Sequence, residues 1–204
     1  MDRQGGGQGR ATGRIMAALA VVLAGGLAGC VSLPVSTPGQ REASARAVIE
    51  NWSTDSRLLA AKFLEQYGSP DRVASDRLTW EDKGPWQATT VYDRVPFYTA
   101  DDGPDDLRQS VARSVPPDKI FALRQFSGKL QVSRDGSLLS ANSTSEAVSF
   151  LLVNLADDVI AGRASPQAAA AAYERAIQLY QAGKTPPAMQ GLLWTGKPAA
   201  GIGP

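Results

Sequence analysis

The stretch RLTWEDKGPWQATTVYD, residues 77–93, changes the spacing of apolar side chains from a helical period to a strand period. Apolar and polar residues alternate on both sides of Gly84-Pro85, which is typical of two strands joined by a turn. The residues just before it, up to Gly68, show helical spacing instead. We therefore expect helices and an antiparallel sheet in the same domain.

Two helices are predicted ahead of this hairpin, over residues 41–52 and 55–67. In the second, Leu59, Phe63 and Tyr67 recur every four residues and form one apolar stripe. Such a stripe has to be buried against another element, and the hairpin that follows is the nearest candidate.

After the hairpin, the pattern predicts a short helix over 105–115 and a second one over 116–126 that begins at a proline pair. Asp135-Gly136 then favours a type I′ turn between two short strands, which makes a second hairpin. Ser143 and Glu146 have the spacing of a capping box at the start of an apolar helix over 144–162.

A last helix is predicted over 166–183, with Ser165 as its cap. Because only a few residues separate it from the helix before, the two should pack antiparallel. The fold class that follows is α+β. We expect a single domain with two β-hairpins in a small antiparallel sheet, packed by helices, and two antiparallel C-terminal helices.

Composition limits the chemistry of the chain. It has 204 residues, no histidine and one cysteine, which excludes Ser-His-Asp and Cys-His catalysis, histidine zinc sites and an internal disulfide. There are 21 Lys and Arg against 20 Asp and Glu, a balance that does not favour a nucleic-acid partner. No cofactor and no metal are expected.

The single cysteine lies at the end of an apolar run, residues 15–29, that follows a start carrying Arg3, Arg10 and Arg14. A basic start, a short apolar segment and small residues are typical of a secretory signal peptide. The boundary reads Leu-Ala-Gly-Cys over 27–30 and resembles the bacterial lipobox. A small buried cysteine in an apolar segment is the alternative interpretation.

The lipobox resemblance implies that Cys30 carries a diacylglyceryl group and that the signal is cut between Gly29 and Cys30. It also implies acylation of the new amino terminus, with fatty chains such as palmitate. Two or more chains hold a protein stably on a membrane. Because Val31 and not Asp follows the cysteine, the resemblance further implies the outer membrane, facing the periplasm, in a Gram-negative source. In a Gram-positive source it implies the outer face of the cytoplasmic membrane.

The expected organisation has four parts: a removed signal peptide (1–29), the lipidated cysteine with a flexible tether (30–40), an α+β domain (41–190) and a disordered tail (191–204). Prolines and small polar residues without periodicity indicate the tether. Glycine and proline indicate the tail.

Two sets of side chains are candidates for ligand binding. The hairpin aromatics Trp80, Trp86 and Tyr92, with Phe97 and Tyr98 beyond them, could stack on a sugar or peptide, although strand periodicity favours burial in the core. The acidic loop holds Asp101, Asp102, Asp105 and Asp106, whose spacing does not match an EF-hand. A solvated loop in which the last aspartate caps a helix is the plainer interpretation.

Asp157 and Asp158 are a third candidate, because they are adjacent in an apolar helix. Neighbouring residues on a helix point about 100° apart, so they do not form a catalytic pair by themselves. We expect one of them to pair with Arg163.

The stretch EQYGSPDRVASDRLTWEDKGPW, residues 65–86, resembles a local pattern of uncharacterised exported bacterial proteins. It also resembles the SmpA/OmlA-like outer-membrane lipoproteins that assist barrel assembly, which place a Gly-x-Pro turn before a strand with Trp. Those proteins lack two long C-terminal helices, so no functional residue is carried over from them.

The sequence thus predicts a membrane-anchored bacterial envelope lipoprotein that acts as a non-enzymatic binding or assembly module with an envelope protein partner. The alternative is a carboxylate-based enzyme or ligand receptor that acts on a periplasmic polymer through the hairpin aromatics and the acidic loop.

Overall fold

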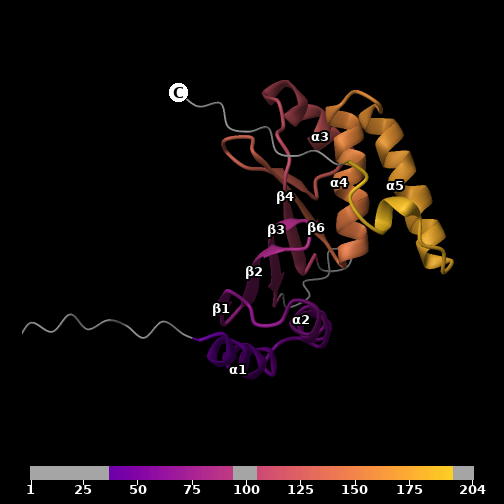
Figure 1. The fold of residues 1–204 in the computed structure, drawn as a ribbon. Helices are drawn as coiled ribbons and strands as arrows, with labels where there is room; N and C mark the ends of the chain where they lie inside the picture. The colour runs from indigo at the N-terminus through magenta and orange to yellow at the C-terminus, as the bar shows by residue number, and fades with distance from the viewer. Residues whose placement is uncertain (1–36, 94–104, 195–204) are drawn as a thin grey trace, which may run out of the picture. The chain divides into compact units, whose positions relative to one another are not determined.

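The computed structural model describes residues 37–93 and 105–194 and confirms an α+β fold. Helices and an antiparallel sheet follow one another along the chain (Figure 1). The elements are α1 (Pro38–Ile49), α2 (Thr54–Tyr67), β1 (Arg72–Ala74), β2 (Arg77–Lys83), β3 (Trp86–Tyr92), β4 (Leu107–Ala112), η1 (Pro117–Lys119), α3 (Ile120–Phe126), β5 (Leu130–Val132), β6 (Leu138–Ser143), α4 (Glu146–Ile160), α5 (Pro166–Gln181) and η2 (Pro187–Met189).

The strands form one six-stranded sheet in the order β1-β2-β3-β4-β6-β5, and every neighbouring pair is antiparallel. The two predicted hairpins are present as β2–β3 and β5–β6. Two further strands extend them: β1 pairs with β2 at one edge, and β4 joins the hairpins in the middle.

Alternating side chains give the sheet one apolar face. The register places Leu78 opposite Val91, Val91 opposite Leu107, and Val111 opposite Leu139, so these residues share that face. Helices α1 and α2 contact it over β1, β2 and β3, while α3 and α4 contact it over β4, β5 and β6. The opposite face is polar, with hydroxyl pairs such as Thr79–Thr90 and Ser110–Ser140.

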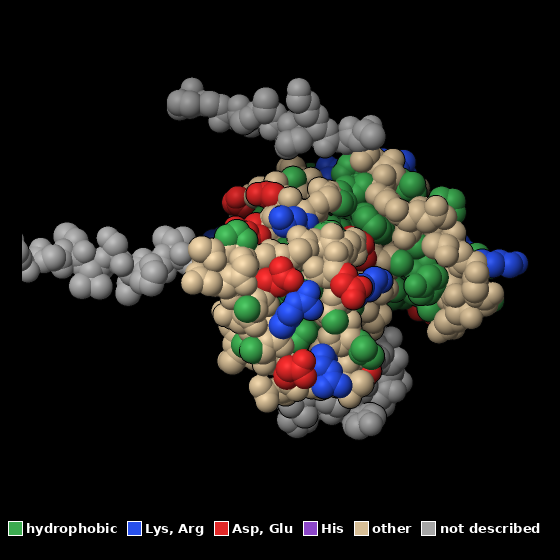
Figure 2. All heavy atoms as spheres, turned by 60° about the horizontal axis from the view of Figure 1, so that its bottom comes forward, with side chains coloured by type: hydrophobic (Ala, Val, Ile, Leu, Met, Phe, Trp, Pro, Cys, Tyr) green, Lys and Arg blue, Asp and Glu red, His purple; other side chains and the backbone are tan. Residues whose placement is uncertain are grey.

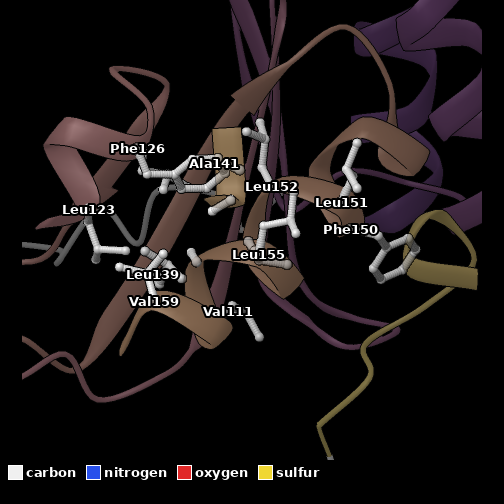
Figure 3. Close-up of a cluster of buried hydrophobic side chains, with 14 of the residues drawn as sticks. Val111, Leu123, Phe126, Leu139, Ala141, Phe150, Leu151, Leu152, Leu155 and Val159 are labelled. Carbon is white, nitrogen blue, oxygen red and sulfur yellow. The ribbon is translucent and has the colours of Figure 1, made fainter. Parts of the chain in front are cut away.

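Two clusters of buried hydrophobic residues lie under these helices. One joins α1 and α2 to β2 and β3 and is built around Phe63 and Trp80. The other joins α3, α4 and α5 to β4 and β6, and Figure 3 shows its side chains from α3, β6 and α4 packed together. Among the described residues, the buried hydrophobic side chains lie between Ala45 and Met189.

The expected helix over 105–115 was wrong, because this segment contains strand β4. Leu107, Gln109 and Val111 point into the protein and are buried, while Arg108 and Ser110 alternate with them on the polar face. Leu, Arg, Gln and Ala favour helices. Pairing with β3 on one side and β6 on the other outweighs that preference.

Two local details also differ from expectation. The residue that caps α4 is Ser145, whose hydroxyl accepts from the amide of Val148, whereas Ser143 ends β6. At the second hairpin, Gly136 has φ 73° but Asp135 does not have positive φ, so the turn is not type I′. The amide of Gly136 instead donates to the carbonyl of Ser133 at 2.9 Å.

The ends of the described domain agree more closely with the sequence pattern. Ser165 caps α5 as predicted, and the few residues between α4 and α5 make these helices antiparallel neighbours (Figure 1). Helix α1 begins at Pro38, ahead of the expected start at 41, because Thr37 and Gln40 form a capping box. Within the described residues, no helix is both long enough and apolar enough to cross a membrane.

Candidate functional site

The tryptophans of the first hairpin are buried in the core. Trp80 is 0% exposed and Trp86 is 1% exposed. The Nε1 of Trp80 donates to the carbonyl of Gly68 at 2.9 Å, and its ring lies 5.9 Å from that of Phe63. The ring of Trp86 lies 4.9 Å from that of Phe150, in the other cluster. Neither ring is open to a ligand, so these two residues do not form the stacking platform considered from the sequence.

Tyr92 is the third aromatic candidate and lies at the end of β3, half-buried. The guanidinium of Arg108 lies 5.5 Å from the centre of its ring, within the range of a cation–π contact. Arg108 also donates from Nε to Oδ1 of Asn142 at 2.8 Å. Tyr92 thus lies on the polar face of the sheet, and its ring already contacts the guanidinium of Arg108.

The acidic loop falls partly outside the described residues, which exclude Asp101 and Asp102 together with Phe97 and Tyr98. Its other two aspartates bind protein groups. Asp105 accepts from Nζ of Lys129 at 2.9 Å, and buried Asp106 accepts from the hydroxyl of Ser56 at 2.9 Å. The expectation that the last aspartate caps a helix was wrong, since a strand follows it.

The adjacent aspartates of α4 pair with arginines. Arg163 contacts both Asp157 and Asp158, where a pair with one of them was expected, and its Nε lies 2.7 Å from Oδ1 of Asp158. Asp157 is buried and also accepts from Nε of Arg113 at 2.6 Å. Two cations therefore hold Asp157 in a structural ion pair. Across residues 37–93 and 105–194, no group of three metal-ligating side chains of the His, Cys, Asp or Glu types comes together.

Asn154 is a buried amide on α4 that binds the chain after α5. Its Nδ2 donates to the carbonyls of Ala188 and Gly191 at 2.9 and 2.8 Å, and its Oδ1 accepts from the amide of Leu193 at 2.8 Å. Because all three partners are backbone groups, Asn154 fixes the path of this segment across α4.

A group of polar side chains surrounds Glu146, the first residue of α4. Its Oε1 accepts from the hydroxyl of Tyr67 at 2.5 Å and from Nε1 of Trp86 at 2.8 Å. Its Oε2 accepts from Nε2 of the exposed Gln66 at 3.0 Å. The carboxylate thereby joins α2, β3 and α4, and Tyr67 packs against both core clusters.

The pKa values of this group define its charge. Burial alone raises the pKa of Glu146, but hydrogen bonds from Gln66, Tyr67 and Trp86 outweigh it and leave the pKa below the ordinary value. Burial, followed by the hydrogen bond to Glu146 and repulsion from its charge, raises the pKa of Tyr67 well above its ordinary value. At neutral pH the group is a carboxylate anion surrounded by neutral donors.

This charge state limits what the group can do. An anion with a lowered pKa, already accepting from Tyr67 and Trp86, is a poor general base and cannot act as a general acid at neutral pH. Its position at the N-terminus of α4 is also favourable for a negative charge. The group therefore acts as an anchor between the two halves of the domain, and sequence spacing assigned Glu146 only to a capping box.

Cys30 and Gly29, the residues of the expected lipidation and cleavage, lie outside the described residues. Comparison of the chain with protein families, with curated proteins and with solved structures found no match. A function is therefore inferred from the sequence and the structure of the chain itself.

Proposed function

We propose that this chain is a bacterial envelope lipoprotein, held to a membrane by lipid on Cys30, whose domain is a non-enzymatic binding or assembly module. The observation that carries the proposal is the arrangement of the first thirty residues. An arginine-containing start, an uncharged run over 15–29 and the sequence Leu-Ala-Gly-Cys occur in that order, with the only cysteine at the boundary.

The distance from this cysteine to the domain supports the proposal. Helix α1 begins at Pro38, eight residues beyond Cys30. An extended chain spans at most about 3.6 Å per residue, so α1 begins within about 29 Å of the lipidated residue. Such an anchor holds the end of the domain that carries α1 close to the membrane surface, with no need for a spanning helix.

The engagement of the carboxylates supports a binding role over catalysis. Among the described residues, the buried acids Asp106 and Asp157 and the half-buried Glu146 each have protein partners, and Trp80 and Trp86 are buried. The alternative of a carboxylate enzyme depends on the acidic loop and the hairpin aromatics. Of those groups, Tyr92 and Asp105 lie at described and partly open positions, and Asp105 is paired with Lys129.

The anchor is tested by Cys30→Ala in the native host, with Gly29→Ala as the matched control. The control keeps a small residue before the cysteine, so it should mature and incorporate labelled palmitate as the wild type does. Cys30→Ala should lose the label and keep its leader. Equal labelling and an equal membrane fraction in the two variants would overturn the proposal.

The role of the module is tested by crosslinking in cells. We expect the lipidated protein to recover a defined envelope protein, and Cys30→Ala to recover less of it because the domain is no longer concentrated at the membrane. Recovery of no envelope protein, with a normal envelope after deletion, would count against a binding or assembly role.

A further inference from the structure

A pocket of about 560 Å³ lies between α1 and the β1–β2 edge of the sheet. Three structural elements line it, and they come together only in the folded chain. The lining residues are Arg41, Ser44, Asp71, Arg72, Val73, Ala74, Arg77 and Thr79.

Short side chains lie beside long arginines in the lining of the pocket. The register pairs Arg72 with Thr79 and Ala74 with Arg77, which puts these four residues on one face of the two strands. Ala74 and Thr79 are short, whereas Arg72 and Arg77 are long. Ser44 of α1 is a further short side chain in the lining.

The lining carries three positive charges against one negative charge. Arg41 donates from Nε to the carbonyl of Pro70 at 2.9 Å, which orients its guanidinium at the α1 wall. The single acid, Asp71, accepts from the amide of Glu81 through Oδ2 at 2.8 Å. Its carboxylate is therefore held toward the backbone of β2, and the arginines set the charge of the pocket.

Two of the arginines make surface ion pairs. Arg72 lies 2.7 Å from Glu81, and Arg77 lies 3.7 Å from Asp76, with all four side chains between 46% and 68% exposed. Exposed pairs of this kind stabilise a protein by about 0–1 kcal/mol. An anion that binds several guanidinium groups at once can compete with them, because charge-assisted and bidentate hydrogen bonds are stronger.

We propose that this pocket binds a phosphate-bearing anion through Arg41, Arg72 and Arg77. Guanidinium groups match the oxygens of a phosphate bidentately, and the hydroxyls of Ser44 and Thr79 add polar groups in the same hollow. If Cys30 is lipidated, α1 lies within reach of phospholipid headgroups. The inference rests on the proposed function only if the phosphate belongs to a membrane lipid, since the pocket itself needs no anchor.

Diffuse attraction to a negative surface would not explain such binding. The chain has a formal net charge of +1. Figure 2, in which the end that carries α1 and α2 faces forward, shows basic and acidic side chains interspersed, with neither gathered in a large patch. Binding should therefore depend on the pocket's own residues and on its empty volume.

The test uses the chain from residue 31, which contains both core clusters. Inorganic phosphate and glycerol phosphate are titrated while the backbone amide signals of β1 and β2 are followed by NMR. Arg72→Gln and Arg77→Gln should each weaken binding about tenfold, or about 1.4 kcal/mol. Ala74→Leu fills the hollow without a change of charge and should weaken binding as much.

Arg46→Gln is the matched control, because it removes one positive charge from α1 outside the pocket, where Arg46 pairs with Glu42 at 2.8 Å. It should leave binding unchanged. Urea unfolding of each variant shows whether Ala74→Leu keeps the fold. If Ala74→Leu does not keep the fold, Arg72→Gln and Arg77→Gln still test the proposal, because both arginine side chains are exposed and replacing them should leave the fold intact.

Vesicles of phosphatidylcholine, with and without phosphatidylglycerol, separate the two sources of phosphate. Binding to the anionic vesicles that glycerol phosphate displaces identifies a membrane headgroup. Saturable binding of glycerol phosphate alone identifies a soluble phosphate compound. No saturable binding, or an equal loss in Arg46→Gln and Arg72→Gln, overturns the proposal. Because the chain from residue 31 lacks Cys30, these results do not depend on whether that cysteine is lipidated in the full-length protein.

Discussion

Removing the carboxylate of Glu146 should cost more stability than removing any exposed acid of this domain. Its Oε1 is the acceptor for two inward-facing donors, the hydroxyl of Tyr67 and Nε1 of Trp86. Glu146→Ala removes that acceptor from both donors, and water reaches Trp86 poorly at 1% exposure. A buried donor left unpaired costs about 1–3 kcal/mol. Two such donors should cost about 4 kcal/mol.

Glu146→Gln is the informative comparison. A glutamine oxygen in the place of Oε1 keeps the bonds from Tyr67 and Trp86. Its amide then takes the place of Oε2, beside the exposed Gln66. The charge and the acceptor for the exposed Gln66 are lost, so we expect a cost of about 1 kcal/mol. Glu42→Ala, which removes an exposed pair with Arg46, should cost less than about 1 kcal/mol.

Urea unfolding followed by tryptophan fluorescence measures these differences. For an m-value of about 2 kcal/mol per molar, Glu146→Ala should lower the midpoint by about 2 M. If all variants have the same m-value, the differences between their urea midpoints reflect the stability of the folded state and not a change in the unfolded state. A midpoint for Glu146→Ala within the range of Glu42→Ala, or equal to that of Glu146→Gln, would refute the assignment of Glu146 as an anchor.

Three further predictions concern Glu146, Asn154 and Asp157. The folded pKa of Glu146 lies below its ordinary value of 4.5, so its contribution to the free energy of unfolding is present above pH 4.5 and is lost as the pH falls toward the folded pKa. Below pH 4.5, the urea midpoint of Glu146→Gln should therefore fall less steeply with pH than that of the wild type. Identical curves would contradict this. Asn154→Ala removes three bonds to backbone groups and should cost about 2 kcal/mol, with faster proteolysis after α5; unchanged proteolysis would contradict this. Asp157→Ala leaves Arg113 without its carboxylate and should lower the thermal midpoint more than Asp158→Ala, whose side chain is 39% exposed; equal midpoints would contradict this.

The fold class could be predicted because most elements carry local signals. Residues 77–93 alternate around Gly84, and α5 begins at Ser165-Pro166, where cap and proline agree. Strand β4 could not be told from a helix by composition, although Leu107, Gln109 and Val111 do alternate with polar residues. What decides its state is pairing with β3 and β6, and β6 lies about thirty residues away along the chain.

The Glu146 anchor had no sequence signal beyond a capping-box spacing. Tyr67 and Trp86 lie 79 and 60 residues from it, so only the packing of α2 and β3 against α4 brings them together. The pocket was missed for the same reason. Arg41 and Arg77 are ordinary surface residues in the sequence, and only the register of β1 and β2 shows that the small residue Ala74 lies beside them in the pocket lining.

We propose that fatty chains on Cys30 hold the domain at a membrane. Mass spectrometry of the amino-terminal peptide of protein purified from its native membrane tests it most directly. We predict that the peptide begins at Cys30, lacks residues 1–29 and carries a diacylglyceryl group on the sulfur. A free thiol at Cys30, or a peptide that still contains the leader, would contradict the claim.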